Sequence, residues 1–267
     1  MLFVGIDLAW SPRNNTSVAI LEGNNKKAIL TKYANLDSDE DIMNFVKENV
    51  QDKDAIIAID APLIVPNEKG RRLAEDIVGK LFRKFNAGAH PANRERLSQW
   101  SGSIRGEEIS RLLEKEGFEH NPYIKKYEKS RAFYEVYPHP SMVVLFNLDS
   151  IIKYKAKPKR DYPYRWKEFK KYQKYMASLE KANPSVALPK EIINQKVEKL
   201  KGSSLKKYED SLDAIFCAYI SYYHWTNPEK CEVLGNMKEG YILTPIFDYM
   251  KKDLISFKSQ SSLSKFA

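Results

Sequence analysis

Five acidic side chains stand at positions where a carboxylate needs a partner. Asp7 and Asp60 each close a short apolar run that is typical of a buried strand, and Glu135 lies near the end of a third. Asp210 and Asp213 are three residues apart on a predicted helix, so their side chains point toward the same face. Two like charges there disfavour each other unless a cation neutralises them. For this pair alone, an exposed helix start in which acids complement the helix dipole is the alternative.

Acids on separate rigid elements favour hard divalent cations. Mg²⁺ and Mn²⁺ take oxygen ligands, and two such ions about 3.5 to 4 Å apart can activate a water and stabilise the leaving oxygen in phosphodiester hydrolysis. The sequence argues against zinc, because its four histidines and two cysteines show no HxxxH or CxxC spacing. The fingerprints of P-loop, dinucleotide and α/β-hydrolase sites are absent as well.

The formal charge of +9 is unevenly distributed along the chain. Residues 153–207 contain 17 Lys or Arg against 5 Asp or Glu, an excess of +12 that leaves −3 for the rest. Such a stripe favours contacts with the phosphates of DNA or RNA, and a solvated lysine-rich surface is the alternative. The residues expected on the lysine face of a helix there are Lys167, Lys170, Lys171 and Lys174.

Four further side chains could contact a substrate phosphate. Arginine matches phosphate in a bidentate way, which makes Arg71, Arg72 and Arg83 candidates, although solvation of a helix surface is the plainer interpretation of each. His139, between two prolines, could orient a water or a phosphate, or it could pack in a rigid turn.

The acids are carried by elements whose order the sequence predicts. Apolar runs and alternation indicate strands at residues 2–7, 16–22, 27–33, 55–60 and 132–137, and a terminal hairpin at 232–234 and 241–243. A helix capped by Ser38 lies between the third and fourth strands. A broad apolar stripe over 209–225 predicts the helix that carries Asp210 and Asp213.

Composition sets the protein class. With 43% hydrophobic and 30% charged residues, residues 1–267 are expected to form one globular domain with insertions at about 66–130 and 150–207. No apolar run reaches 18 residues, so no membrane partner is expected. Cys217 and Cys231 lie in unlike contexts, which favours free thiols and a cytoplasmic setting. The sequence leaves the oligomeric state open, a homodimer included.

These residues resemble a known superfamily. The strand order with Gly5-Ile6-Asp7 on the first strand and Asp60 on the fourth resembles the RNase H-like superfamily, and the DxxD pair resembles its RuvC-like branch. More closely, the chain is similar to the domain-of-unknown-function family 429, described as predicted RNase H-like nucleases. The pattern appears here as Gly5-Ile6-Asp7-Leu8-Ala9, Ile59-Asp60-Ala61-Pro62-Leu63, Gly70-Arg71-Arg72 with Asp76, Glu135-Val136-Tyr137-Pro138, Asp210-Ser211-Leu212-Asp213-Ala214, and Glu239-Gly240-Tyr241-Ile242 followed by Pro245.

The resemblance implies a fold and a set of roles. The fold is a mixed five-stranded RNase H-like sheet with helices on both faces and two helical insertions. Asp7 would bridge two Mg²⁺ or Mn²⁺ ions, Asp60 would bind one, and Asp210 and Asp213 the other. Glu135 would be either a fifth ligand or a structural acceptor.

The function expected from this resemblance is metal-dependent hydrolysis of nucleic acid. A non-catalytic module that binds nucleic acid or protein on the same fold is the alternative. An ATP-binding version of the topology needs Gly-rich phosphate loops, which the residues after Asp7 do not provide.

Overall fold

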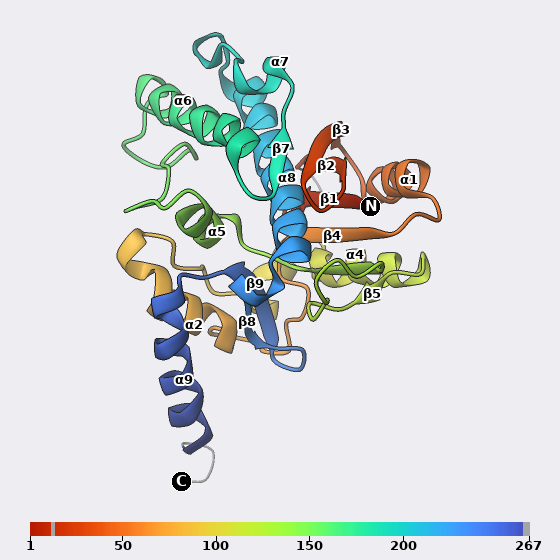
Figure 1. The fold of residues 1–267 in the computed structure, drawn as a ribbon. Helices are drawn as coiled ribbons and strands as arrows, with labels where there is room; N and C mark the ends of the chain where they lie inside the picture. Colours follow the sequence, from red (N-terminus) through yellow and green to blue (C-terminus); the bar gives the residue numbers. More distant parts are fainter. Residues whose placement is uncertain (12–13, 264–267) are drawn as a thin grey trace.

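The computed structural model describes residues 1–11 and 14–263. Within them, seven strands form one mixed sheet in the order β5-β6-β4-β1-β2-β3-β7. Figure 1 shows its central strands β4, β1, β2 and β3 one above the other. The strands are β1 (Leu2–Asp7), β2 (Thr16–Gly23), β3 (Lys27–Leu36), β4 (Ala55–Asp60), β5 (Glu119–His120), β6 (Arg131–Glu135) and β7 (Ser185–Ala187). The mixed α/β class is therefore confirmed, while the expected number of five strands is corrected to seven.

The two additional strands lie at the two edges of the sheet. β5, within residues 66–130, pairs with β6 over two residues, and β7, within residues 150–207, pairs with β3 over three. Each covers backbone groups that an edge strand would otherwise leave unpaired. Segments this short produce no periodic pattern, which is why the sequence did not predict them.

Strand direction places two acids side by side. β1 is antiparallel to β2 and parallel to β4, and its register pairs Asp7 with Asp60. Because parallel strands end at the same edge of a sheet, both carboxylates leave the sheet at one point. β4 is also parallel to β6, where Ile59 is level with Glu135.

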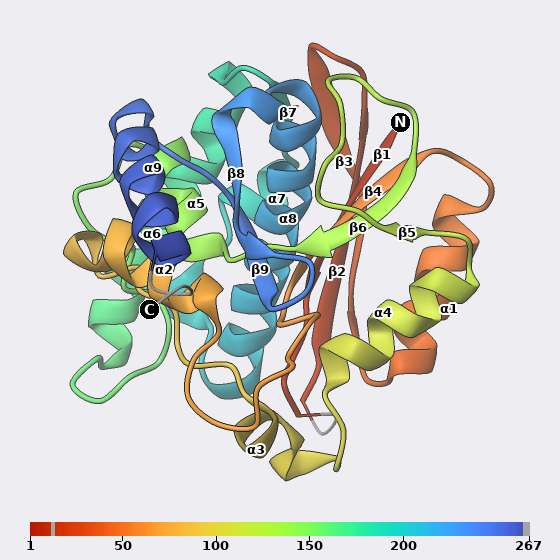
Figure 2. The ribbon, with the colours of Figure 1, turned by 90° about the horizontal axis from the view of Figure 1, so that it is seen from below.

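Helices cover both faces of the sheet (Figure 2). On one face, Leu2, Val4 and Ile6 pack in a cluster with residues of α1 (Asp39–Val50) and α4 (Arg105–Lys115). On the other, Phe3 packs in a cluster with α8 (Gly202–Thr226). Since successive strand residues alternate between faces, Gly5 and Asp7 belong to the face that α8 covers.

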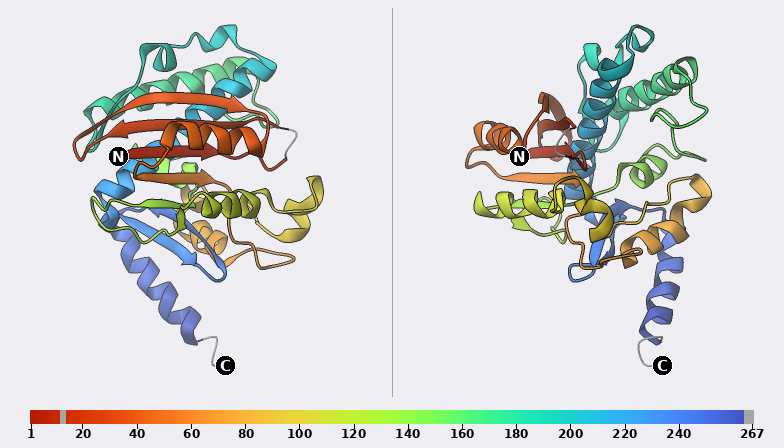
Figure 3. Two further views of the ribbon diagram at one scale, coloured as in Figure 1. Left: turned by 90° about the vertical axis from the view of Figure 1, so that its right-hand side faces the viewer. Right: turned by 180° about the vertical axis from the view of Figure 1, so that it is seen from behind.

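The remaining elements surround this core. They are the helices α2 (Leu73–Phe82), α3 (Arg94–Leu97), α5 (Pro138–Leu145), α6 (Tyr162–Ser178), α7 (Lys190–Ile193) and α9 (Asp248–Leu263), and the hairpin β8 (Cys231–Asn236) and β9 (Gly240–Pro245). The predicted terminal hairpin and the Ser38-capped helix α1 are confirmed. Figure 3 shows α9 extending away from the other elements.

The cysteines and the lengths of the helices bear on two expectations from composition. Cys217 and Cys231 are both free. None of the helices in the described residues combines the length and apolar character needed to cross a bilayer.

Gly5 allows α8 to lie directly on β1. A Cβ atom at this position would stand 2.0 Å from the carbonyl oxygen of Ala214 and 2.2 Å from the backbone nitrogen of Ala218. Both atoms belong to the backbone of the helix and cannot turn aside as a flexible side chain would. The backbones of β1 and α8 are therefore in contact next to Asp213.

We predict that Gly5→Ala lowers the free energy of unfolding by about 3 kcal/mol or more, because the added methyl group forces helix and strand apart. Denaturant unfolding measures the change. Gly79→Ala is the matched control: its Cβ would meet only the end of the Arg83 side chain, at 3.6 Å, so the stability should stay within about 1 kcal/mol of wild type. Equal effects of the two substitutions would contradict the prediction.

Candidate functional site

Three elements gather four of the five predicted acids in one place. Asp7 and Asp60 are register partners at the ends of β1 and β4, and α8 crosses both strands with Asp210 and Asp213. Their charges interact, since those of Asp213, Asp210 and Asp60 all contribute to raising the pKa of Asp7. Asp213 and Asp210 are buried, whereas Asp7 and Asp60 are partly exposed. Solvent therefore reaches the cluster through the strand-end acids.

Asp213 is held by two tyrosines and one lysine. The Tyr154 hydroxyl donates to its Oδ1 at 2.6 Å, and the Tyr172 hydroxyl donates to the same oxygen at 3.3 Å. The Lys155 ammonium lies 2.9 Å from Oδ2 as an ion pair, although it is not aligned for a hydrogen bond. The two oxygens of Asp213 thus have different partners.

Although Asp7 and Asp60 are partly exposed, their carboxyl groups have lost much of their contact with water, which makes them hard to ionise. This burial raises the pKa of Asp7 well above its usual range, with the neighbouring carboxylates adding to the effect and Lys155 opposing it. Burial likewise raises the pKa of Asp60 to about 7, again against Lys155 and with a contribution from Asp213. At neutral pH the cluster therefore favours a proton or a cation beside Asp60.

Asp210 has its own cation. The Lys206 ammonium lies 2.5 Å from Oδ1 of Asp210 and 2.9 Å from Oε1 of Glu209, and the other oxygen of Glu209 pairs with Arg165 at 3.2 Å. Burial raises the pKa of Asp210, and Lys206 opposes the rise. Each of the two helix acids is therefore paired with its own lysine, Asp210 with Lys206 and Asp213 with Lys155.

The cluster fits a hard divalent cation in chemistry but not in its present spacing. Its donors are carboxylate oxygens, and Oδ2 of the fully buried Asp213 makes no hydrogen bond. No three His, Cys, Asp or Glu residues of the described chain form a group arranged to hold a metal ion. A divalent ion there would therefore require Asp7, Asp60 and Asp213 to rearrange before they could hold it.

Glu135 lies on the opposite face of the sheet from this cluster, although its charge contributes to raising the pKa of Asp60. On β6, Tyr134 packs on the α8 side while Phe133 packs on the opposite side, and alternation places Glu135 with Phe133. Its Oε2 accepts from the backbone nitrogen of Leu63 at 2.9 Å, and the Arg72 guanidinium donates to both its oxygens at 2.9 and 2.6 Å. Of the two roles left open, the contacts favour the structural acceptor.

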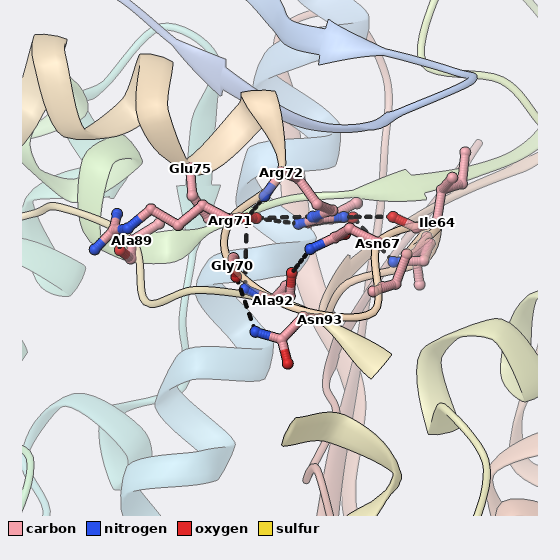
Figure 4. A network of polar contacts seen from close by, with 12 residues as sticks. Ile64, Asn67, Gly70, Arg71, Arg72, Glu75, Ala89, Ala92 and Asn93 are labelled. Carbon is pink, nitrogen blue, oxygen red and sulfur yellow. Dashed lines mark hydrogen bonds and ion pairs between the residues drawn. The ribbon is translucent and has the colours of Figure 1, made fainter. Parts of the chain in front are cut away.

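Arg72 has an interior role rather than the expected contact with substrate. It is buried between Glu135 and Glu75, with its Nη2 2.6 Å from an oxygen of each. It also donates to the carbonyl oxygen of Ile64, and Figure 4 shows Arg72 with Glu75 and Ile64. These bonds join α2 to the strand ends. Arg71 and Arg83, in contrast, are exposed, and Arg71 donates to the carbonyl oxygen of Ala89 at 3.4 Å.

His139 lies next to the cluster as a packed ring. Its ring stacks on that of Tyr137, with ring centroids 5.6 Å apart. The ring centroid of Tyr154, which donates to Asp213, lies 6.1 Å from that of His139. Burial, together with the charge of Lys155, lowers its pKa to about 3, so the ring is neutral at pH 7.

The four candidate lysines are exposed on α6, and two of them are paired. Lys170 forms an ion pair with Glu198, and Lys171 lies 2.5 Å from Glu168. Lys170 and Lys174 also line an open groove of about 570 Å³, whose other charged residues are Lys196, Glu198 and Lys199. Acids therefore offset part of the positive charge on this surface.

The sequence did not assign Tyr154, Lys155, Tyr172 or Lys206 to the acid cluster. Tyr154 and Lys155 lie in a segment without helix or strand, and Lys155 is one of many lysines between residues 153 and 207. No local pattern distinguishes it from a solvated surface residue. Lys206 precedes Asp210 by four residues on α8, and this helical spacing could have indicated the ion pair.

We predict that Arg72→Met lowers the free energy of unfolding by about 3 to 5 kcal/mol, because it leaves two buried carboxylates without their cation. Arg71→Met, with the same change on the adjacent exposed residue, should alter it by about 0.5 kcal/mol or less. Chemical denaturation of both variants provides the measurement. A stable Arg72→Met protein would show that the buried network is not needed.

Comparison with known proteins places the chain in a family. No curated protein matches it. A family model described as a protein of unknown function, DUF429, matches residues 5–239, which include all five predicted acids. The chain therefore belongs to the DUF429 family.

Proposed function

We propose that this protein is a metal-dependent nuclease with an RNase H-like core. The observation that carries the proposal is the convergence of Asp7, Asp60 and Asp213 from two adjacent strand ends and one crossing helix. Grouping carboxylates out of water in this way is costly even with Lys155 beside them, and residues with raised pKa values are frequent at functional sites. A site that binds divalent cations offsets this cost.

The strand order supports the RNase H-like assignment. The five central strands, β6-β4-β1-β2-β3, combine an antiparallel β1-β2-β3 unit with parallel β4 and β6. This arrangement agrees with what the resemblance of the sequence implies. The two edge strands then extend the core at the points where the insertions return to it.

Each side chain of the site would have its own role in hydrolysis. Asp7 and Asp60, which are partly exposed residues, would hold a divalent ion, and Tyr154 fixes the orientation of Asp213 through Oδ1. A bound Mg²⁺ or Mn²⁺ supplies charge for the phosphate and lowers the pKa of an attacking water. His139 is neutral and packed, so it would not act as a cationic contact for the substrate.

The substrate we propose is DNA or RNA, bound through its backbone by α6. Lys167 and Lys174 are exposed on this helix, and the groove beside Lys174 adds Lys196 and Lys199. Exposed lysines attract phosphates without regard to sequence. Arg71 and Arg83 remain candidates for phosphate contacts because they too are exposed.

One observation favours a second candidate function. Lys155 and Lys206 already pair with two of the four acids, an arrangement that can exist without any metal. A non-catalytic module that binds nucleic acid would need no more than this internal neutralisation.

We predict that the purified protein hydrolyses nucleic acid in the presence of Mn²⁺ or Mg²⁺ and that Asp7→Asn lowers the rate by about 100-fold or more. The variant should stay folded, because it removes a charge that is unfavourable to bury. Cleavage of labelled DNA and RNA, with and without EDTA, measures the effect. Asp52→Asn, an exposed acid, is the control and should leave the rate unchanged. Turnover equal to wild type in Asp7→Asn would reject the proposed centre.

We also predict that replacing Lys167, Lys170, Lys171 and Lys174 with Gln weakens nucleic-acid binding and flattens its salt dependence. Each lost phosphate contact lowers the log–log slope by about 0.7 to 0.9. Because Lys170 and Lys171 are paired with acids in the free protein, the total should correspond to between two and four contacts.

Fluorescence anisotropy at several salt concentrations measures this slope. The matched control replaces four exposed lysines elsewhere, Lys26, Lys27, Lys32 and Lys53, with Gln. If both quadruple variants change the slope equally, net charge rather than the α6 surface determines binding.

A further inference from the structure

Lys155 enters the acid cluster on a segment that is anchored beside it. Residues 151–160 form neither helix nor strand. Tyr154 is fully buried, its hydroxyl donates to Asp213, and its carbonyl oxygen accepts from Nε of Arg165 at 2.9 Å. The backbone nitrogen of Lys153 donates to Glu168 at 2.9 Å. These bonds fix the backbone on which Lys155 is carried.

The Lys155 side chain is partly exposed, unlike its buried neighbour Tyr154. Its ammonium lies 2.9 Å from Oδ2 of Asp213, but 30% of the side chain is exposed, whereas that of Asp213 is fully buried. A lysine side chain is a point charge on a flexible four-carbon stem. The ammonium can therefore leave the cluster while the backbone stays in place.

The anchored tyrosine and the movable lysine contact different oxygens of Asp213. Oδ1 accepts from Tyr154 and Tyr172, which keeps the carboxylate in one orientation. Oδ2 makes no hydrogen bond and has only the unaligned ion pair with Lys155. A cation that takes the place of the ammonium would gain Oδ2 without disturbing either tyrosine.

The charges of the cluster support such an exchange. Asp213, Asp7 and Asp60 are the carboxylates that interact most strongly with the Lys155 ammonium. They are also the three acids of the divalent-ion site in the proposed function. Because cations repel each other at short range, an ammonium and a metal ion would not share Oδ2.

We propose that Lys155 is a tethered counter-ion that occupies the cation position beside Asp213 and must withdraw before a divalent ion binds there. The inference rests on the proposed function and adds a control to it. In the metal-free protein the ammonium holds the buried acids together. In the metal-bound protein it moves toward solvent, so the affinity for metal is lower than the acids alone would give.

The test compares metal binding in the full-length wild type, Lys155→Met and Lys157→Met, each first freed of metal with EDTA. Isothermal titration with Mn²⁺ should show about tenfold tighter binding to Lys155→Met, because no ammonium has to be displaced. Lys157→Met removes the same charge from an exposed residue two positions along the segment and should bind as the wild type does.

Thermal unfolding gives a second readout. Without metal, Lys155→Met should melt at a lower temperature than the wild type, since its acids repel each other unopposed. Saturating Mn²⁺ should raise the melting temperature of this variant by more than it raises that of the wild type. If Lys155→Met does not fold, Lys155→Gln removes the charge while keeping a polar end, and the same two measurements apply.

The outcomes separate the inference from the proposed function. Equal or weaker Mn²⁺ binding by the charge-removed variant, with clear binding by the wild type, overturns the role of Lys155 and leaves the metal site standing. An absence of Mn²⁺ binding in all variants overturns the proposed function and the inference together. Tighter binding by both Lys155→Met and Lys157→Met would assign the effect to net charge and overturn the specific role.

Discussion

The contact between the backbones of β1 and α8 at Gly5 is the constraint on which the site depends. The helix carbonyl that lies closest to Gly5 belongs to Ala214, the residue directly after Asp213. Since β1 ends two residues after Gly5, this contact brings the helix acid to the level of Asp7. Any side chain at Gly5 would hold the helix away from the strand and open the acid cluster.

Placing acids inside a protein creates an electrostatic cost that the surrounding residues must offset. Here the cost is divided between hydroxyl donors and lysines: Tyr154 and Tyr172 bind one oxygen of Asp213, while Lys155 and Lys206 supply positive charge. The hydroxyl bonds are buried and fixed, but the lysine side chains reach solvent. The same arrangement can therefore be stable without metal, and it would allow the cation exchange that we propose for Lys155.

Two acids at neighbouring strand ends lie on opposite faces of the sheet, because successive side chains of a strand point to alternate faces. Asp60 lies on the face that α8 covers, whereas Glu135 lies on the other and binds Arg72. Together with Glu75, these residues join the start of α2 to the sheet. α2 is thus held to the end of the sheet by buried charge, close to the acid cluster.

The sequence by itself determined the central strands, the long acidic helix, the terminal hairpin and the positions of Asp7 and Asp60, because apolar runs and strand ends are local features. Alternation along β6 could also have assigned Glu135 to the opposite face. Only the tertiary structure decided which edge strands pair with the sheet and which side chains form the buried ion pairs. The edge strands are too short to leave a pattern, and the pairing of Arg72 with Glu135 or of Lys155 with Asp213 joins residues more than 55 positions apart. Such ion pairs depend on how the elements pack, since nothing near Lys155 in the sequence distinguishes it from a surface lysine.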